Sequence, residues 1–290
     1  MRISLSVTNF SWPGGPAAIA DSLAEVARAA DEGGLDTLWV NDHLLQADPG
    51  AASDERDMLE VYTTLGYLAG CTRRLRLGAM VSPVTYREPA LLVKAVTTLD
   101  VLSGGRAWLG VGVGYPVEAE AMGLPMPPTA ERFERLTELL DLFEQMGRGD
   151  PSPFRGRHYR LAHPENRPAA VQPGGIPVLV GGMGRQKTLR LVARYARACN
   201  LFDIPDGGAT VRERLELLHR HCAELGRDPA EVETTVSTRL ERGEDADHVT
   251  ERLTALRAWG IEHAVFITPG PWTAGAVQTL VAAAARVATR

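Results

Sequence analysis

Lysine is almost absent from this sequence of 290 residues, in which Lys94 and Lys187 stand beside 29 arginines. Both lysines fall in expected helices, so no lysine lies at a strand end, where a Schiff-base aldolase needs its amine. Cysteine is equally scarce. The chain has three cysteines far apart in sequence, without a CxxC spacing. This pattern excludes a disulfide framework and a zinc knuckle, and it is typical of free thiols in a reducing cytoplasm.

Long apolar runs and a surplus of basic charge are also missing. No apolar stretch is long enough for a membrane helix, and "MRISLSV" is too short for the core of a signal peptide. The formal net charge of −5 gives no basic footprint for nucleic acid. Apolar residues make up 44% and charged residues 23% of the chain, enough for a sizeable core. We therefore expect a cytoplasmic protein that binds neither nucleic acid nor a membrane.

Short apolar, β-branched segments alternate with amphipathic segments along the whole chain. The expected strands cover 3–8, 35–41, 75–82, 106–114, 176–182, 199–204, 232–238 and 263–268. The expected helices cover 16–34, 57–71, 89–103, 130–146, 185–198, 211–226, 245–260 and 274–288. Strict alternation without a linker predicts a single domain over residues 1–290, with the fold of a (β/α)8 TIM barrel. A doubly wound sheet is the alternative, because alternation alone does not show that the sheet closes.

One irregular segment, residues 147–175, separates the fourth helix from the fifth strand. A loop this long inside a compact domain is usually functional or disordered. Its residues Phe154, His158, Tyr159 and Leu161 suggest a small hairpin. We expect this insertion to form a partly ordered lid over the barrel mouth, with an inert surface insertion as the alternative.

The carboxyl ends of the strands carry the active site in barrels of this kind. The seven histidines are scattered, and no HxH pair ends the first strand, so a metal hydrolase is disfavoured and no metal site is expected. Asp42-His43 ends the second strand. A helix cap beside a packed imidazole is the structural alternative, but the place at a strand end favours a functional pair.

Two glycine-rich strand ends suggest a bound ring and a bound phosphate. "LGVGVGYP" (109–116) fails as a dinucleotide fingerprint, because Tyr115-Pro116 follows the third glycine instead of a helix. Its glycines either let a ring approach the backbone or relieve crowding. "PVLVGGMGRQKT" (177–188) does not spell GxGxxG, but it resembles a strand that turns into a helix over a phosphate.

Several motifs together resemble the bacterial luciferase-like monooxygenase superfamily, in its branch of deazaflavin (coenzyme F420)-dependent oxidoreductases. They are "NDHL", "YREPALLVK", "TLDVLSGGR", "GVGVGY", "ERFERL", "FRGRHYRL" and "IPVLVGGMG", in that order over nearly the whole chain. The resemblance implies a TIM barrel with an insertion before strand five. It also implies F420 as cofactor, with FMN as the alternative, and a homodimer formed through the second and third helices.

The resemblance further implies a cofactor site. A non-prolyl cis peptide at Met80–Val81 would form a bulge behind the ring, His43 would lie beside the ring, and the glycine run after the insertion would bind the phosphate. Arg185 or Lys187 would add positive charge there. The cofactor-binding residues expected on this basis are Asp42, His43, Met80, Val81, Ser82, Gly112, Gly114, Gly181, Gly182, Met183, Gly184, Arg185 and Asn200.

The sequence departs from the family at one position of chemical importance. Some F420-dependent members place a glutamate acid just after the strand-four glycines, where this chain has Tyr115. A tyrosine with its ordinary pKa of about 10 is a weak proton donor, so Tyr115 either joins His43 as a catalytic residue or stacks on the ligand. Phe10, Trp12, Tyr115 and Trp272 are expected on the substrate side, with ordinary packing as their alternative.

The expected function is reduction of a small-molecule biosynthetic intermediate at a C=C or C=N bond, with hydride from F420H2. An FMN-dependent monooxygenase is the first alternative, and a flavin- or deazaflavin-binding barrel without turnover is the second. An isomerase or lyase acting on a phosphorylated substrate is weakened by the missing strand-end lysine.

Overall fold

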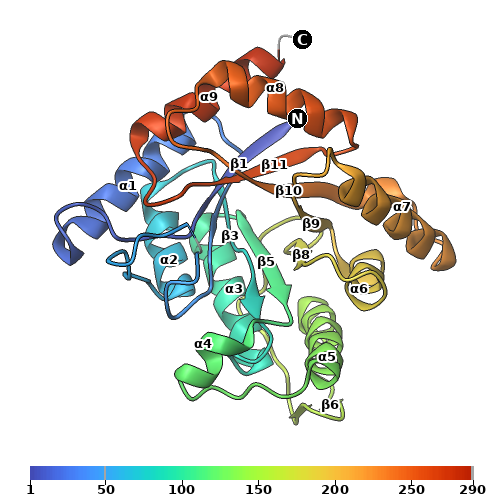
Figure 1. Ribbon diagram of the computed structural model, residues 1–290. Coiled ribbons are helices and arrows are strands. Elements are labelled where there is room, and N and C mark those ends of the chain that lie inside the picture. Colours follow the sequence, from blue (N-terminus) through green and yellow to red (C-terminus); the bar gives the residue numbers. More distant parts are fainter. Residues whose placement is uncertain (49, 289–290) are drawn as a thin grey trace.

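A closed parallel barrel forms the centre of the molecule (Figure 1). The computed structural model describes residues 1–48 and 50–288. Neighbouring strands follow the order β3-β2-β1-β11-β10-β9-β8-β5-β4, and a further pairing of β3 with β5 closes the ring. The barrel strands are β1 (Arg2–Val7), β2 (Thr37–Val40), β3 (Arg76–Ala79), β4 (Ser82–Pro83), β5 (Ala107–Gly112), β8 (Val178–Gly181), β9 (Ala198–Phe202), β10 (Glu233–Arg239) and β11 (His263–Ile267). The predicted (β/α)8 barrel is confirmed, and closure excludes the doubly wound sheet.

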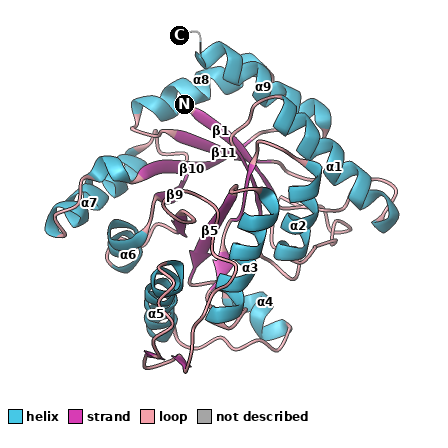
Figure 2. Ribbon diagram, turned by 180° about the vertical axis from the view of Figure 1, so that it is seen from behind, coloured by secondary structure: helices cyan, strands magenta, loops and turns pink. Residues whose placement is uncertain are grey.

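Eight helices surround the barrel within the described residues (Figures 1 and 2). Proline occupies the first position of α1 and α3, and glycine follows the last residue of each, as the stereochemistry of helix ends favours. No helix in the described part of the chain has the length and apolar character to cross a bilayer. The eight are α1 (Pro16–Glu32), α2 (Val61–Cys71), α3 (Pro89–Ser103), α5 (Thr129–Gly147), α6 (Lys187–Tyr195), α7 (Ala209–Glu224), α8 (Ala246–Ala258) and α9 (Ala274–Ala288).

Three local features differ from the sequence prediction. A short helix, α4 (Pro116–Ala121), follows β5 where a loop was expected. Helix α2 begins at Val61 rather than at residue 57, because the Glu60 side chain accepts a hydrogen bond from the N–H of Thr63 and caps the helix. The strand expected over 75–82 is divided into β3 and β4 by the Met80–Val81 peptide bond, which is cis as the resemblance implied.

The insertion at 147–175 contains the expected hairpin, but not over the barrel mouth. Strands β6 (Phe154–Arg155) and β7 (Arg160–Leu161) pair antiparallel. Phe154 and Leu161 pack against Val93 of α3 and Leu142 and Met146 of α5. Residues 147–175, all of them described, contribute no side chain to the cavity at the mouth. The predicted lid is therefore wrong: the apolar residues of the hairpin cover helices on the outside of the barrel.

The barrel interior is closed by large side chains below the mouth. Trp39 of β2 and Trp108 of β5 face each other with ring centroids 5.8 Å apart, and Leu179, Ala198 and Val265 complete this layer. Met80 and Val81 pack on the same layer. The interior is thus a packed core whose upper surface forms the floor of the cavity at the carboxyl ends of the strands.

Candidate active site

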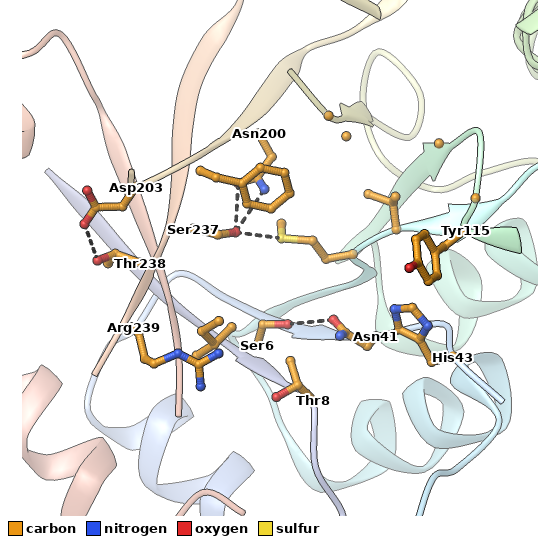
Figure 3. Close-up of a pocket in the computed structure, with 18 of the residues that line it drawn as sticks. Ser6, Thr8, Asn41, His43, Tyr115, Asn200, Asp203, Ser237, Thr238 and Arg239 are labelled. Atoms are coloured by element: carbon orange, nitrogen blue, oxygen red, sulfur yellow. Dashed lines mark hydrogen bonds between the residues drawn. The ribbon is translucent and has the colours of Figure 1, made fainter. Parts of the chain in front are cut away.

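A cavity of about 800 Å³ opens at the carboxyl ends of the barrel strands (Figure 3). In the figure His43 and Tyr115 lie on one side of it, and Asp203, Thr238 and Arg239 lie on the other. Of the predicted site residues, the wall includes His43, Met80, Val81, Gly112, Gly114, Tyr115, Gly181, Gly182 and Asn200. The structure thus brings together residues that follow β2, β3, β5, β8 and β9.

His43 is held in place by a carboxylate that the sequence analysis did not identify. Nδ1 of His43 lies 2.7 Å from Oε1 of Glu118, whose side chain is only 6% exposed. The same carboxylate accepts hydrogen bonds from the Tyr86 hydroxyl and from the N–H groups of Leu44 and Leu45. A carboxylate at Nδ1 places the ring proton on that nitrogen and leaves Nε2 as the nitrogen available to the cavity.

The surroundings of Tyr86 keep it a hydrogen-bond donor. Burial and the hydrogen bond to Glu118 raise the pKa of Tyr86 well above its ordinary value. Its hydroxyl therefore stays protonated and stabilises the Glu118 anion, as buried charge requires. Glu118 lies three residues beyond Tyr115, in the first turn of α4. The signal that was available was an acidic residue in the first turn of a helix that begins with Pro116.

Asp42 and Ser82 do not line the cavity, contrary to the prediction. Asp42 is 2% exposed and forms a two-pronged ion pair with Arg87, with N–O distances of 2.5 and 3.1 Å. Arg87 also contacts Glu60 at 2.5 Å. Ser82, fully buried, is hydrogen bonded to Tyr62. Asp42 and Ser82 thus hydrogen bond to the side chains of Arg87 and Tyr62 and do not line the cavity.

The strand-end glycines make room for Val81. A Cβ atom at Gly112 would lie 2.9 Å from a Val81 methyl group, and one at Gly181 would lie 2.8 Å from the other. At Gly110 a Cβ atom would lie 1.9 Å from the carbonyl oxygen of Ala79. Of the two explanations for these glycines, relief of crowding is therefore the one with a direct structural cause. Any approach of a ring to this wall depends on the same small residues.

The residues predicted to bind a phosphate lie at the end of β8 and in the loop that leads to α6. Gly182, with φ at +112°, lies on the cavity wall, whereas Met183, Gly184 and Arg185 lie beyond it. No hydrogen bond within the described chain engages the backbone N–H groups of Met183, Gly184 and Arg185. These donors precede α6, where the helix dipole favours an anion.

The cations beside this loop already have partners. The guanidinium of Arg185 is 2.6 Å from Glu213, and Lys187 lies 5.3 Å over the ring of Phe133. The charge of Arg185 is therefore paired, whereas Lys187 keeps its positive charge, because an aromatic ring does not neutralise a cation. Backbone N–H groups remain the main donors that this loop offers.

Three of the aromatic residues expected on the substrate side belong to the core. Phe10, Trp12 and Trp272 are 0%, 7% and 1% exposed and do not line the cavity. The Trp12 indole donates to the carbonyl of Trp272, and the Trp272 indole donates to the carbonyl of Ser6. Packing, the alternative reading, is what the structure shows for them. Tyr115 does line the cavity.

The opposite wall is polar. Ser237 accepts a hydrogen bond from the Asn200 amide at 2.9 Å and lies 3.8 Å from the Met80 sulfur (Figure 3). Asp203 accepts from the hydroxyl of Thr238 at 2.7 Å. These residues stand at the strand ends that the barrel rule selects, so sequence position alone placed them near the site.

Comparison with known proteins agrees with the fold. A family model described as luciferase-like monooxygenase matches residues 1–288. An F420-dependent glucose-6-phosphate dehydrogenase of Kineococcus radiotolerans is 32% identical over 79% of this chain, and the chain spans only 66% of that relative. A solved F420-dependent secondary alcohol dehydrogenase, in complex with an F420-acetone adduct, has a TM-score of 0.83 at 16% identity, covering 99% of this chain and 98% of its own. Monooxygenase RslO1 from Streptomyces bottropensis has a TM-score of 0.80 at 17% identity, covering 97% and 98%.

The two solved structures are similar in fold alone at these identities. The family match extends over nearly every residue of the chain. This chain belongs to the luciferase-like monooxygenase family.

Proposed function

We propose that this chain is an F420-dependent oxidoreductase, and specifically a reductase that delivers hydride to a C=C or C=N bond of a small molecule. The observation that carries the proposal is His43, fixed by Glu118 at 2.7 Å on the wall of a cavity of about 800 Å³. The relative from Kineococcus radiotolerans, named as F420-dependent, supports the choice of cofactor.

The residues present fit such a cofactor. The Met80–Val81 peptide, with Gly112 and Gly181 beside it, offers a smooth wall for a flat ring. The unengaged N–H groups of Met183, Gly184 and Arg185 would hold the phosphate at the start of α6. Reduced F420, when bound, would supply the hydride.

The chain itself would position the reactants and manage a proton. His43 would accept a proton or a hydrogen bond at Nε2 from a group bound in the cavity, because Glu118 holds its Nδ1. Tyr115, 60% exposed at the cavity edge, would cover the bound ring or serve as proton donor. The closed barrel below would exclude water from the floor.

Two other functions have specific support. Similarity in fold to a monooxygenase supports an FMN-dependent oxygenase. The relative named glucose-6-phosphate dehydrogenase supports oxidation of a sugar phosphate. Both functions would use the one cavity described above, so the cofactor and the acceptor have to be identified separately.

The test is a fluorescence titration of the purified chain with F420 and with FMN, followed by turnover. We expect F420 to bind, and F420H2 to be consumed when unsaturated ketones or cyclic imines are added. Tight binding of FMN without any response to F420 would overturn the proposal. Binding of F420 without oxidation of F420H2 by any acceptor would instead indicate a carrier without turnover.

A further inference from the structure

Exposed apolar side chains gather around the mouth of the cavity. Among the described residues, 11 large hydrophobic side chains are exposed, and six of them stand at the end of β9 or on the segments that follow β2, β5 and β9. These six, which we name the apolar rim, are Leu45, Tyr115, Val117, Met122, Phe202 and Ile204. Such a concentration is informative, because scattered single hydrophobic residues are normal on a surface and a gathered set marks a binding site.

The rim is continuous with the cavity. Tyr115 and Phe202 are 60% and 51% exposed and also line the cavity wall. Leu45 lies against α4, since its N–H donates to Glu118 of that helix. The backbone N–H of Phe202 contacts the Met183 sulfur at 3.4 Å, which fixes this side of the rim to the loop after β8.

The charges of the cavity wall leave little to attract an anion. Among the described residues of the wall, the arginines are Arg239 and Arg252, and the carboxylates Asp203 and Glu241 match them in number. Arg239 is 3.0 Å from Asp48, and a Cβ atom at Gly50 would lie 2.8 Å from its other terminal nitrogen. The loop before α2 thus encloses this guanidinium.

Arg252 is engaged in the same way. Its guanidinium forms an ion pair with Glu244 and donates to the carbonyl of Arg239. A phosphate monoester carries about two negative charges and is recognised through cations or bidentate arginines that are free to contact it. Neither arginine of this wall is in that state.

We propose that the acceptor is an uncharged, largely apolar molecule with a conjugated carbonyl or an imine, whose apolar body extends from the cavity across the rim. This inference rests on the proposed function and names its substrate class. In the reduction of a conjugated enone, the C=C π bond breaks and the β-carbon gains the hydride that reduced F420 gives up. The α-carbon gains a proton from water, so the acceptor is reduced and the cofactor oxidised by two electrons. A sugar phosphate lies outside this substrate class.

Binding to the cofactor-free chain tests the inference without relying on turnover. The probes are cyclohexenones with alkyl chains of increasing length, measured by calorimetry, with glucose 6-phosphate and inorganic phosphate as anionic probes. We expect the Kd of the enones to fall about two- to fourfold for each added methylene group, as burial of apolar surface predicts. We expect neither anion to displace a bound enone in the same concentration range, whereas phosphate bound at the loop before α6 would leave the enone in place.

Substitutions in the apolar rim test whether the rim causes the dependence of Kd on alkyl chain length. Phe202→Ser and Val117→Ser should flatten the dependence on chain length, while Leu225→Ser, equally apolar and exposed at the far end of α7, should leave it unchanged. A dependence that survives both rim substitutions, or displacement of a bound enone by glucose 6-phosphate or phosphate in the same concentration range, would overturn the inference.

A separate arm keeps the two proposals distinct. F420 affinity is measured for the wild type and for Phe202→Ser. Loss of F420 affinity in Phe202→Ser with an unchanged chain-length dependence would assign the rim to the cofactor and refute the substrate class. Failure of the wild type to bind F420, with the chain-length dependence intact, would refute the proposed function and leave the apolar site standing.

Discussion

Glu118 joins three segments of the site at one carboxylate. It accepts from His43, from Tyr86 before α3, and from the backbone after β2, and its own helix follows β5. An ionised acceptor with four donors is a strong and directional anchor. In this chain the acidic group reaches the site from the first turn of α4.

The first prediction concerns this carboxylate. Glu118→Gln should lower kcat about 10- to 100-fold, because loss of a charge-assisted hydrogen bond of about 1.5–3 kcal/mol disorders His43 in the reacting state. The F420 affinity should change less than kcat, and the measurement is steady-state turnover of F420H2 beside fluorescence titration. Tyr86→Phe, which removes one donor and leaves the carboxylate, should lose clearly less activity.

Two outcomes would speak against this role. Equal losses in Glu118→Gln and Glu118→Ala, together with a matching fall in the melting temperature, would indicate that the carboxylate only stabilises the fold. Unchanged kcat in Glu118→Gln would show that His43 does not need the anion.

At the scale of elements, proline and glycine residues at helix ends determined which helix boundaries could be predicted from the sequence. Helix α3 was predicted to the residue, because Pro89 and Gly104 mark both of its ends. Helix α4 was missed, since its six residues carry too short a pattern for periodicity. Glu118 was missed with it. From the family resemblance, an acidic residue was expected directly after the glycines in sequence. In the structure Glu118 lies further on, and the first turn of α4 brings its carboxylate back to His43.

Tertiary contacts explain the other errors. The aromatic residues Phe10, Trp12 and Trp272 stand at strand ends or in loops, where barrel geometry permits a ligand contact. The indole N–H groups of the two tryptophans instead donate to backbone carbonyls, and Phe10 is buried in the core. The hairpin at 154–161 has the apolar residues of a lid, yet it covers α3 and α5. Which surface an apolar group covers depends on its packing partner, and local sequence does not contain that partner.

The second prediction concerns the ends of β5 and β8. Gly181→Ala should lower the free energy of unfolding by about 1–3 kcal/mol, because its Cβ would lie 2.8 Å from a Val81 methyl group. Val81→Ala removes both methyl groups and leaves the Val81 Cβ 3.5 Å away. In the double variant most of the loss from Gly181→Ala should therefore disappear, which urea denaturation in a double-mutant cycle measures.

The matched control is Gly66→Ala in α2, where an added Cβ would meet nothing within 4 Å. This change should be neutral or stabilise by up to about 1 kcal/mol, because alanine is the better helix former. Strictly additive losses in the Gly181–Val81 cycle would contradict the crowding explanation and return these glycines to a direct role at the ligand.

At the scale of the whole molecule, the two ends of the barrel have different tasks. The carboxyl ends hold the cavity, while the opposite end is closed by buried polar groups. Ser4 of β1 lies 2.5 Å from His263 of β11, which lies 2.7 Å from Glu233 of β10. Hydrolase triads share this order of groups, but Ser4 has no exposed surface. The chain of hydrogen bonds instead ties the first strand to the last two, at the point where the barrel closes.

Asp31 performs a similar task where α1 ends beside the start of β3, and it gives the stability of the fold a defined pH dependence. Asp31 is 7% exposed, and its carboxylate accepts three backbone hydrogen bonds, from Arg73, Arg74 and Leu75, at 2.7–2.9 Å. Burial raises the pKa of this carboxyl group, but the three N–H donors lower it more, so the pKa lies below its ordinary value of 3.8. A carboxyl group with a lowered folded-state pKa stabilises the fold above its ordinary pKa, and this contribution is lost as the pH falls through the folded-state value.

The last prediction follows from that sign. Asp31→Asn should lower the free energy of unfolding by about 1–3 kcal/mol at neutral pH, because an amide nitrogen would face the N–H of Arg73 and the anion would be gone. The difference from the wild type should shrink as the pH falls below about 4, since the wild-type carboxyl group then becomes protonated as well. Urea denaturation at several pH values measures this, with Glu25→Gln on the exposed face of α1 as the control that should change little. A difference that stays constant between neutral and acid pH would mean that Asp31 acts through its shape and not its charge. The fall in the free energy of unfolding at acid pH would then not arise from protonation of Asp31.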